Sequence, residues 1–308
     1  MTNPFETDSE GKNCPPCNAR AEKAIPFIGR YIDESKVTSN SFSSRKSPAY
    51  MTFGYVRCQC CLTAFSSKAP DSSALARAYH DADQNTSAEA EYAAATYRGY
   101  LEPLLAGLSR RGTCLEIGTG TGAFLAQLRD LGFVDLVGLE PSPAAIAAAR
   151  PDLRPFIREG VFTGDELPPG SVSLICCFQT LEHVSEPKDL VEKAYRLIEP
   201  GSKLTLVTHD YNAIINRALG RKSPIVDIEH MQLFCPQSIK YLLEDTNFVI
   251  EHIKTIRNTY PLQYWVSLLP IPATSKRTLI RGMRVGQIAE TAIAINVGNI
   301  LTVATKLR

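Results

Sequence analysis

A short apolar segment that runs directly into three closely spaced glycines constrains the fold of this chain more than any other feature. The segment Thr113–Phe124 reads TCLEIGTGTGAF and contains Gly118, Gly120 and Gly122. Glycine lets the backbone turn sharply and approach a ligand closely. A helix predicted to begin at Ala123 would present unpaired N–H groups and a positive dipole end behind this turn. A strand, a glycine turn and a helix in this order predict an α/β fold that binds a ligand at the turn.

Three later segments continue the alternation of strands and helices. A second predicted strand, 134–139, ends in Glu140, at the position where an acidic residue accepts the ribose hydroxyls of a nucleoside. The apolar run Val172–Phe178 predicts a strand buried on both sheet faces, and QTLEHV follows it. In LIEPGSKLTLVT, residues 197–208, a helix end and a Pro-Gly turn precede another strand. This alternation predicts a mostly parallel sheet.

The motifs occur in the order E-x-G-x-G-x-G, E-P-S, L-E-H-V and E-P-G-x-x-L. In this order the chain resembles the class I S-adenosylmethionine (SAM) dependent methyltransferases, most strongly over residues 111–210. The alternative is a nicotinamide-dinucleotide site, whose preferred G-x-G-x-x-G spacing puts the third glycine one residue later. The resemblance implies an α/β fold with a Rossmann-like seven-stranded sheet. Its last strand, 299–306, would be inserted antiparallel between the fifth and sixth strands.

The resemblance also implies where SAM would bind. Its methionine part would lie against the backbone at Gly118 and Gly120, with Glu116 near the amino group. The carboxylate of Glu140 would accept two hydrogen bonds from the ribose. The residues expected around the cofactor are Glu116, Gly118, Thr119, Gly120, Gly122, Glu140, Pro141, Val161, Phe162 and Gln179.

The adenine contact is expected to differ from that of many relatives. They often carry an acidic residue directly after the glycine at this point, whereas Gly160 is followed here by Val161 and Phe162. Apolar packing and backbone hydrogen bonds would then hold the adenine. Asp165, a little further along the chain, is the alternative polar partner.

Three histidines are the candidate catalytic residues. Methyl transfer is a direct displacement in which the alignment of acceptor and methyl group is the largest effect. A general base helps where the acceptor must lose a proton, and histidine is the usual choice. His183, His209 and His230 each lie at the end of a predicted strand or in the loop beyond it. Purely structural roles for these histidines are the alternative.

A catalytic metal is a further hypothesis for the same region. Small-RNA 2′-O-methyltransferases and ubiquinone-pathway O-methyltransferases use a carboxylate-plus-histidine set near this strand end. Glu182, His183 and His209 would be the corresponding set here. Gln179 stands where the small-RNA enzymes carry another glutamate, which leaves few ligands for an ion.

Two C-x-x-C pairs near the N-terminus predict a structural zinc site. Cys14 and Cys17 form the first pair, and Cys58 and Cys61 form the second. Four thiolates arranged in this way suit a tetrahedral zinc ion. Cys60 could replace a member of the second pair only by spoiling its spacing. The alternative, a redox C-x-x-C, belongs at a helix start beside a βαβ unit and is not expected here.

The segments around these cysteines favour a small zinc ribbon. Residues 50–57 and 62–66 have strand-like patterns on either side of the second pair. The Ser- and Arg-rich stretch 38–47 has no periodicity and is interpreted as a loop. We therefore expect a zinc-ribbon module at 1–70 and a helical linker or lid at 71–110. A methyltransferase domain would follow at 111–308, with cap insertions around 211–235 and 258–297.

Composition limits the classes of partner. The chain has 308 residues, a formal net charge of +1 and nine cysteines. A balanced charge gives no electrostatic footprint for nucleic acid, and no apolar run has the length of a membrane span. The N-terminal twelve residues are polar and do not resemble a signal peptide, so a cytoplasmic location is expected. In that location cysteines are expected to be free or metal-bound.

The expected activity is methyl transfer to a small-molecule acceptor such as a sugar, a glycan precursor or a specialised metabolite. Two alternatives are an RNA methyltransferase with a zinc recognition module and a SAM-binding protein without catalytic activity. The segment Asn258–Pro272, which holds the single tryptophan Trp265, is expected either to form a lid or core cover or to form an acceptor pocket or oligomer surface. A homodimer is a further hypothesis.

Overall fold

The computed structural model describes residues 11–42, 48–68, 70, 72–82, 87–108 and 110–307. The first ten residues, the second half of the Ser- and Arg-rich stretch and Asp71, beside a predicted helix start, lie outside these ranges. None of the helices in the described ranges is long and apolar enough to cross a membrane.

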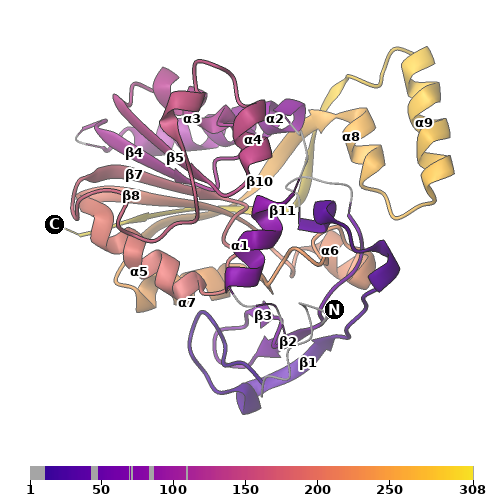
Figure 1. Cartoon of the computed structure of the whole chain (residues 1–308), viewed down its shortest axis with the longest axis horizontal. Helices are drawn as coiled ribbons and strands as arrows, with labels where there is room; N and C mark the ends of the chain where they lie inside the picture. Colours follow the sequence, from indigo (N-terminus) through magenta and orange to yellow (C-terminus); the bar gives the residue numbers. More distant parts are fainter. Residues whose placement is uncertain are drawn as a thin grey trace.

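Seven strands form the main sheet, in the order β10-β11-β8-β7-β4-β5-β6 (Figure 1). Parallel pairing joins β8, β7, β4, β5 and β6, whereas β11 is antiparallel to both β8 and β10. The bounds are β4 Thr113–Ile117, β5 Asp135–Glu140, β6 Ile157–Glu159, β7 Val172–Phe178, β8 Ile198–His209, β10 Val249–Pro261 and β11 Ala292–Thr305. The predicted seven-stranded sheet with one inserted antiparallel strand is confirmed.

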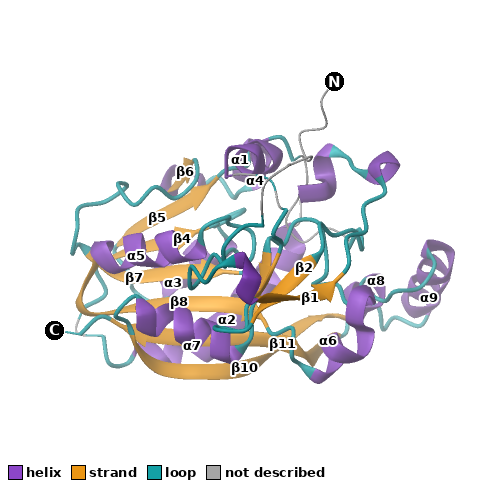
Figure 2. Cartoon of the chain, turned by 90° about the horizontal axis from the view of Figure 1, so that it is seen from below, coloured by secondary structure: helices purple, strands orange, loops and turns teal. Residues whose placement is uncertain are grey.

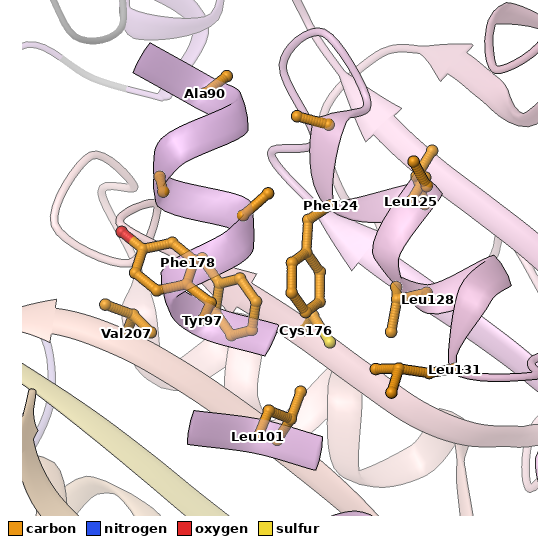
Figure 3. Close-up of a cluster of buried hydrophobic side chains, with 14 of the residues drawn as sticks. Ala90, Tyr97, Leu101, Phe124, Leu125, Leu128, Leu131, Cys176, Phe178 and Val207 are labelled. Carbon is orange, nitrogen blue, oxygen red and sulfur yellow. The ribbon is translucent and has the colours of Figure 1, made fainter. Parts of the chain in front are cut away.

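Helices cover both faces of this sheet, and the two hydrophobic cores lie between the layers. On one face α2 (Ser87–Leu101) and α3 (Ala123–Asp130) pack against the sheet, and on the other face α5 (Pro187–Leu197) and α7 (Pro236–Asp245) do so (Figures 1 and 2). Figure 3 shows the first core, where Tyr97 from α2 and Phe124 from α3 pack against Phe178 at the end of β7. The ring centroids of Phe124 and Phe178 are 4.7 Å apart. The cores fix the carboxyl ends of β4, β5, β7 and β8 relative to one another.

A second, four-stranded sheet lies beside the main one, in the order β1-β2-β3-β9 (Figure 1). Its strands are β1 Ala24–Ile28, β2 Tyr55–Cys58, β3 Ala64–Phe65 and β9 Gln232–Leu233. β9 lies between β8 and β10 in the sequence, so the N-terminal sheet includes a strand from a segment that connects two strands of the main sheet. The strand predicted from residue 50 was too long, because Tyr50 has a φ of 53° and β2 begins only at Tyr55.

The C-terminal part is a long hairpin with two helices at its far end. The first strand of the hairpin, β10, continues to Pro261, and the last strand begins at Ala292 rather than at Asn299 as predicted. Between them lie α8 (Leu262–Ser267) and α9 (Ala273–Val285), and α9 projects from the body of the molecule (Figure 1). Both strands extend beyond the main sheet, and this extension carries the helices away from it.

The remaining elements connect these layers. The α-helices are α1 Ser72–His80, α4 Pro143–Ala148 and α6 Ile214–Leu219. The 3₁₀ turns are Ala21–Lys23, Glu34–Lys36, Ser39–Phe42, Glu102–Leu105, Arg154–Phe156 and Gly220–Lys222. Ser142 at the start of α4 donates a hydrogen bond to the carbonyl of Ala82, just beyond α1. This contact holds α1 beside the carboxyl end of β5.

Candidate active site and zinc centre

A cavity of about 760 Å³ opens at the carboxyl ends of the parallel strands. It is lined by residues from the glycine turn, from α1, from the ends of β5, β7 and β8, and from the C-terminal hairpin. Of the residues predicted to bind cofactor or catalyse, those that line it are Gly118, Gly120, Glu140, Pro141, Val161, Phe162, Gln179, His183, His209 and His230. The turn and all three histidines therefore share one cavity.

The glycine turn has the backbone geometry that its sequence predicts. Gly118 and Thr119 both donate backbone hydrogen bonds to the carbonyl of Leu139 on the neighbouring strand, each 2.9 Å long. Gly118 has a φ of 75°, and a side chain there would collide with Thr180. Gly120 has a φ of 57° and nothing within 4 Å of the position that a Cβ would take. The turn thus leaves bare backbone on the cavity wall.

Glu140 lines the cavity beside the glycine turn, in the part that we call the cofactor half because the resemblance places SAM there. Its carboxylate is 6% exposed and accepts hydrogen bonds from the backbone N–H of Gly120 (2.8 Å) and of Ser142 (2.9 Å). These two bonds fix the carboxylate beside the turn. A carboxylate has further lone pairs that can accept hydrogen bonds from ribose hydroxyls. The bare turn and Glu140 therefore fit SAM, the cofactor that the resemblance implies.

The remaining residues predicted around the cofactor divide into two groups. Glu116 and Thr119 lie behind the turn, where the Thr119 hydroxyl donates to the Glu116 carboxylate over 2.5 Å, and neither lines the cavity. Gly122 does not line it either. Val161 and Phe162 do line it, whereas Asp165 does not. The wall beside Phe162 is therefore apolar at the place expected for the adenine.

His209 is the last residue of β8 and is held by two hydrogen bonds. Its backbone N–H donates to Glu182 Oε1 over 2.6 Å, and its Nδ1 donates to Asn299 Oδ1 over 2.7 Å. Burial lowers the pKa of the imidazole. The ring is therefore neutral near pH 7, with its proton on Nδ1 and its lone pair on Nε2.

His230 and His183 complete a row of three rings. The ring centroids of His209 and His230 are 5.4 Å apart, and those of His230 and His183 are 4.7 Å apart. His230 Nδ1 donates to the carbonyl of Ile225 over 2.8 Å. His183 Nδ1 lies 2.9 Å from the hydroxyl of Tyr79 on α1. Burial raises the pKa of this Tyr79 hydroxyl well above its usual value.

Glu182 points away from the cavity, although its neighbour His183 lines it. The carboxyl group is fully buried, and burial raises its pKa to about 7. Oε1 accepts from His209, and Oε2 has no hydrogen-bond partner among the described residues. Within the described ranges, the group of side chains with metal-ligand spacing is the four-cysteine cluster, and it does not include Glu182.

Sequence reasoning missed a polar pair on the hairpin. Asn258 on β10 and Asn299 on β11 both line the cavity, and Asn299 Nδ2 donates to Asn258 Oδ1 over 2.8 Å. Tyr260, Tyr264 and Trp265 line the same region. The segment around Trp265 was expected as core cover or pocket wall, and it provides a wall. Only the single tryptophan and the nearby tyrosines gave any signal of this in the sequence.

The four predicted zinc cysteines lie together. Cys14 Sγ and Cys61 Sγ are 3.4 Å apart, Cys17 Sγ and Cys58 Sγ are 3.6 Å apart, and all four sulfur atoms lie within 4.8 Å of one another. A tetrahedral ion with Zn–S bonds of about 2.3 Å would separate its ligands by about 3.8 Å. Cys60 is exposed and is not part of the cluster.

The two cysteine pairs have the same backbone geometry. The N–H of Asn18 donates to the carbonyl of Cys14 over 2.7 Å, and the N–H of Leu62 donates to that of Cys58 over 3.1 Å. Asn18 and Leu62 each follow a pair, and their φ values are 53° and 64°. Two equivalent turns that converge on four thiols fit a zinc ion. The interaction with Cys14 also lowers the pKa of the Cys61 thiol, which favours the thiolate form that binds metal.

Comparisons with known proteins identify the family of this chain. Residues 89–253, more than half of the chain, match the family model described as methyltransferase domain. The chain is 36% identical to an uncharacterized methyltransferase of Mycolicibacterium gilvum, over 32% of this chain and 39% of that protein. It is 28% identical to a ubiquinone biosynthesis O-methyltransferase of Pseudomonas paraeruginosa, over 35% of this chain and 48% of that protein. The matches thus span about half or less of these curated relatives.

A solved structure shows the same fold. A proposed methyltransferase from Bacillus halodurans C-125 superposes with a TM-score of 0.50 and 17% identity, covering 68% of this chain and 99% of that one. The dinucleotide alternative for the glycine turn is therefore set aside. The chain belongs to the methyltransferase domain family.

Proposed function

We propose that this chain methylates a hydroxyl oxygen of a small-molecule acceptor, with His209 as the general base. The observation that carries the proposal is that one cavity joins the glycine turn and Glu140 to the row of histidines. SAM, when bound, supplies the methyl group from its sulfonium. The new O–C bond forms as the S–C bond breaks, the bonding pair stays on sulfur, and the hydroxyl proton passes to His209 Nε2.

The roles within the cavity follow from these contacts. The carboxylate of Glu140 and the backbone of Gly118 and Gly120 would hold the nucleoside and methionine parts of SAM. Val161 and Phe162 would pack against the adenine. Gln179, which directly follows β7 and has a φ of 49°, would lie between cofactor and acceptor, since β7 is the strand next to the one that leads into the glycine turn.

His209 is the best of the three histidines for proton removal. Asn299 fixes its tautomer, and its lowered pKa keeps the ring neutral. A base with a pKa near or below the working pH is ready to accept a proton. His230 lies in ring contact with it and would position the imidazole, while His183 would be held by Tyr79 on α1.

A small acceptor fits better than RNA. The cavity is bounded by α1, α8 and the hairpin, and the chain has a formal net charge of only +1. The ubiquinone biosynthesis O-methyltransferase matched above is named for oxygen methylation in a biosynthetic pathway, which supports an oxygen acceptor. We further propose that Cys14, Cys17, Cys58 and Cys61 hold one structural zinc ion.

Substitution of Glu140 tests the cofactor assignment. Glu140→Ala removes the carboxylate from the cavity and is expected to lower affinity for S-adenosylhomocysteine at least 100-fold by isothermal titration calorimetry, because two hydrogen bonds of roughly 1.5–3 kcal/mol each are lost. The matched control is Glu159→Ala, since Glu159 pairs with Glu140 across β5 and β6 but is exposed and outside the cavity. Unchanged affinity in Glu140→Ala would contradict the assignment.

The reaction itself is tested with isotope-labelled SAM. The enzyme is incubated with labelled SAM and a panel of phenols, aliphatic alcohols, sugars and amines, and separately with RNA, and the products are identified by mass spectrometry. We expect the label in an O-methyl ether. A label found on nitrogen or carbon, or only on added RNA, would overturn the proposal.

A further inference from the structure

The acceptor half of the cavity has an apolar and aromatic wall. Tyr260, Tyr264 and Trp265 line it, with ring centroids 4.3 Å apart for the two tyrosines and 5.3 Å apart for Tyr260 and Trp265. Ile295 and Val297 continue this wall on β11. Such a surface binds apolar groups, and aromatic rings in particular, by contact and by edge-to-face packing.

Anionic ligands find little to pair with on this wall. Among the described residues that line the cavity, the one lysine or arginine is Lys193, and it forms an ion pair of 2.6 Å with Asp189 on the same helix. Lys193 also lies beside Gly164, in the loop that follows the expected adenine wall at Phe162. A phosphate or carboxylate on the acceptor would therefore lose its water without gaining a cation, which is costly.

Asn258 is the exception on this apolar surface. It lines the cavity and is only 1% exposed. Its Oδ1 accepts from Asn299, whereas its Nδ2 has no hydrogen-bond partner among the described residues. A buried donor without a partner costs about 1–3 kcal/mol. This donor is therefore a candidate contact for an oxygen atom of a bound molecule.

An irregularity in the hairpin produces this arrangement. Ile256 pairs with Asn299, but Asn258, two residues on, pairs with Ile295, so β11 contains extra residues here. Gly298 in the irregular stretch has a φ of 85°, and a Cβ there would collide with Ala213 and lie 2.9 Å from Asn216 Nδ2. Bulges of this kind re-aim side chains beside active sites. Here the bulge brings Asn299 next to both Asn258 and His209.

We infer that the acceptor is a non-anionic, largely apolar ring compound with two oxygen atoms, and that Asn258 selects it. The hydroxyl to be methylated faces His209, and the second oxygen accepts a hydrogen bond from Asn258 Nδ2. The chain of bonds from His209 through Asn299 to Asn258, 2.7 Å and 2.8 Å long, holds the two recognition groups on one wall. This inference rests on the proposed function and narrows its substrate class.

Trp265 provides a direct measure of acceptor binding. It is the single tryptophan of the chain and lines this wall, where its indole N–H donates to the carbonyl of Ile293 over 3.0 Å. Its fluorescence is titrated in the presence of S-adenosylhomocysteine with 3-pentylphenol, 5-pentylresorcinol, 4-pentylcatechol and UDP-glucose. We expect at least one of the two diphenols to bind about tenfold more tightly than 3-pentylphenol, because one more hydrogen bond forms. UDP-glucose is expected to bind most weakly.

Two variants test the role of Asn258. Asn258→Leu keeps the approximate size of the side chain. It is expected to abolish the preference for the tighter-binding diphenol over 3-pentylphenol, while the affinity for 3-pentylphenol stays within about threefold. Asn258→Asp replaces the hydrogen-bond donor by an acceptor and should also lose this preference. This second variant tests the inference if the leucine variant folds poorly. Retained affinity for S-adenosylhomocysteine checks that the cofactor half is intact.

The outcomes separate this inference from the proposed function. If S-adenosylhomocysteine binds but the phenols do not differ, or UDP-glucose binds best, the inference is wrong and methyl transfer to another small acceptor stands. An unchanged diphenol preference in both variants would remove Asn258 from recognition. If the parent enzyme fails to bind S-adenosylhomocysteine, both the proposed function and the inference fail.

Discussion

His209 shows how two neighbours can prepare a single side chain for chemistry. Asn299 holds its Nδ1 proton, and Glu182 holds its backbone N–H. Neither neighbour lies near it in the sequence, so the pattern T-H-D-Y identified the histidine without revealing why it would be a base. The distinction between His209 and His183 therefore required the structure.

The first prediction concerns His209. His209→Gln is expected to lower kcat by about 10²–10⁴-fold, the usual contribution of a general base, with little change in affinity for S-adenosylhomocysteine. In the parent enzyme, activity should fall on the acid side with a midpoint below the usual histidine pKa of about 6.5, because burial lowers the pKa of His209. His252→Gln, an exposed histidine on β10, is the control. Equal activity in the two variants would mean that a group other than His209 accepts the proton of the acceptor hydroxyl.

Glu182 makes stability depend on pH. Burial raises its pKa to about 7, above the value of 4.5 for an exposed glutamate. Folding therefore favours the protonated form, so its contribution is fully present below pH 4.5 and is lost as pH rises through about 7. A shift of this size corresponds to about 3 kcal/mol. We expect Glu182→Gln to flatten the change in unfolding free energy between pH 5 and 8, measured by urea titration, and a parent-like slope would contradict this.

Among single residues, those of the cofactor half were the most predictable. Gly118, Gly120 and Glu140 belong to contiguous motifs, and a motif of this kind specifies its backbone locally. Asn258 and Asn299 gave no such signal, because an asparagine in a strand is unremarkable until its partner across the hairpin is known. The buried position of Glu182 was likewise invisible, since alternation along the chain breaks down in the loop after β7.

At the scale of elements, the bulge in β11 connects strand geometry to the site. The third prediction is that Gly298→Ala destabilises the protein by about 2–4 kcal/mol, because alanine is strained at this φ and its Cβ collides with Ala213. Thermal unfolding measures the change. The control is Gly282→Ala within α9, where nothing lies within 4 Å and helix propensity predicts a gain of about 0.5–1 kcal/mol. Equal stability of the two variants would show that the bulge tolerates a side chain.

The sequence predicted the buried parallel strands better than the long hairpin strands and the very short strands. The predicted bounds of β7 agree with the structure, because a continuous apolar run defines them locally. β1 was not predicted, and neither was β9, a two-residue strand. Such strands exist only through pairing with distant residues, as Leu233 does with Ala64. Local periodicity carries no information about a partner that far away.

At the scale of the whole molecule, the N-terminal sheet that carries the cysteine cluster is connected to the histidine row. Tyr55 on β2 donates to the carbonyl of His230 over 2.9 Å, and Ser66 donates its N–H to the carbonyl of Met231 over 2.8 Å. The cofactor half has no such link among the contacts described above. Loss of zinc is therefore expected to disturb the histidine row before it disturbs Glu140.

The fourth prediction follows from this connection. Cys61→Ser should lower bound zinc, measured by native mass spectrometry, and speed amide hydrogen exchange across residues 225–234, while affinity for S-adenosylhomocysteine stays within a few fold. Cys60→Ser is the matched control, because Cys60 is adjacent in sequence but exposed and outside the cluster. Complete loss of S-adenosylhomocysteine affinity in Cys61→Ser would contradict the separation of the two halves.

The shared N-terminal sheet has a consequence for the order of folding. During synthesis, both cysteine pairs emerge early and can take up metal as soon as Cys61 leaves the ribosome. The edge of β3, however, pairs with Leu233, which is made 169 residues after Ala64. Until then the nascent ribbon exposes an unpaired strand edge, a recognised route to aggregation. When translation is slow, this strand edge stays unpaired for longer. We therefore expect the yield of folded protein to depend on chaperones under that condition, although the ribbon itself is small.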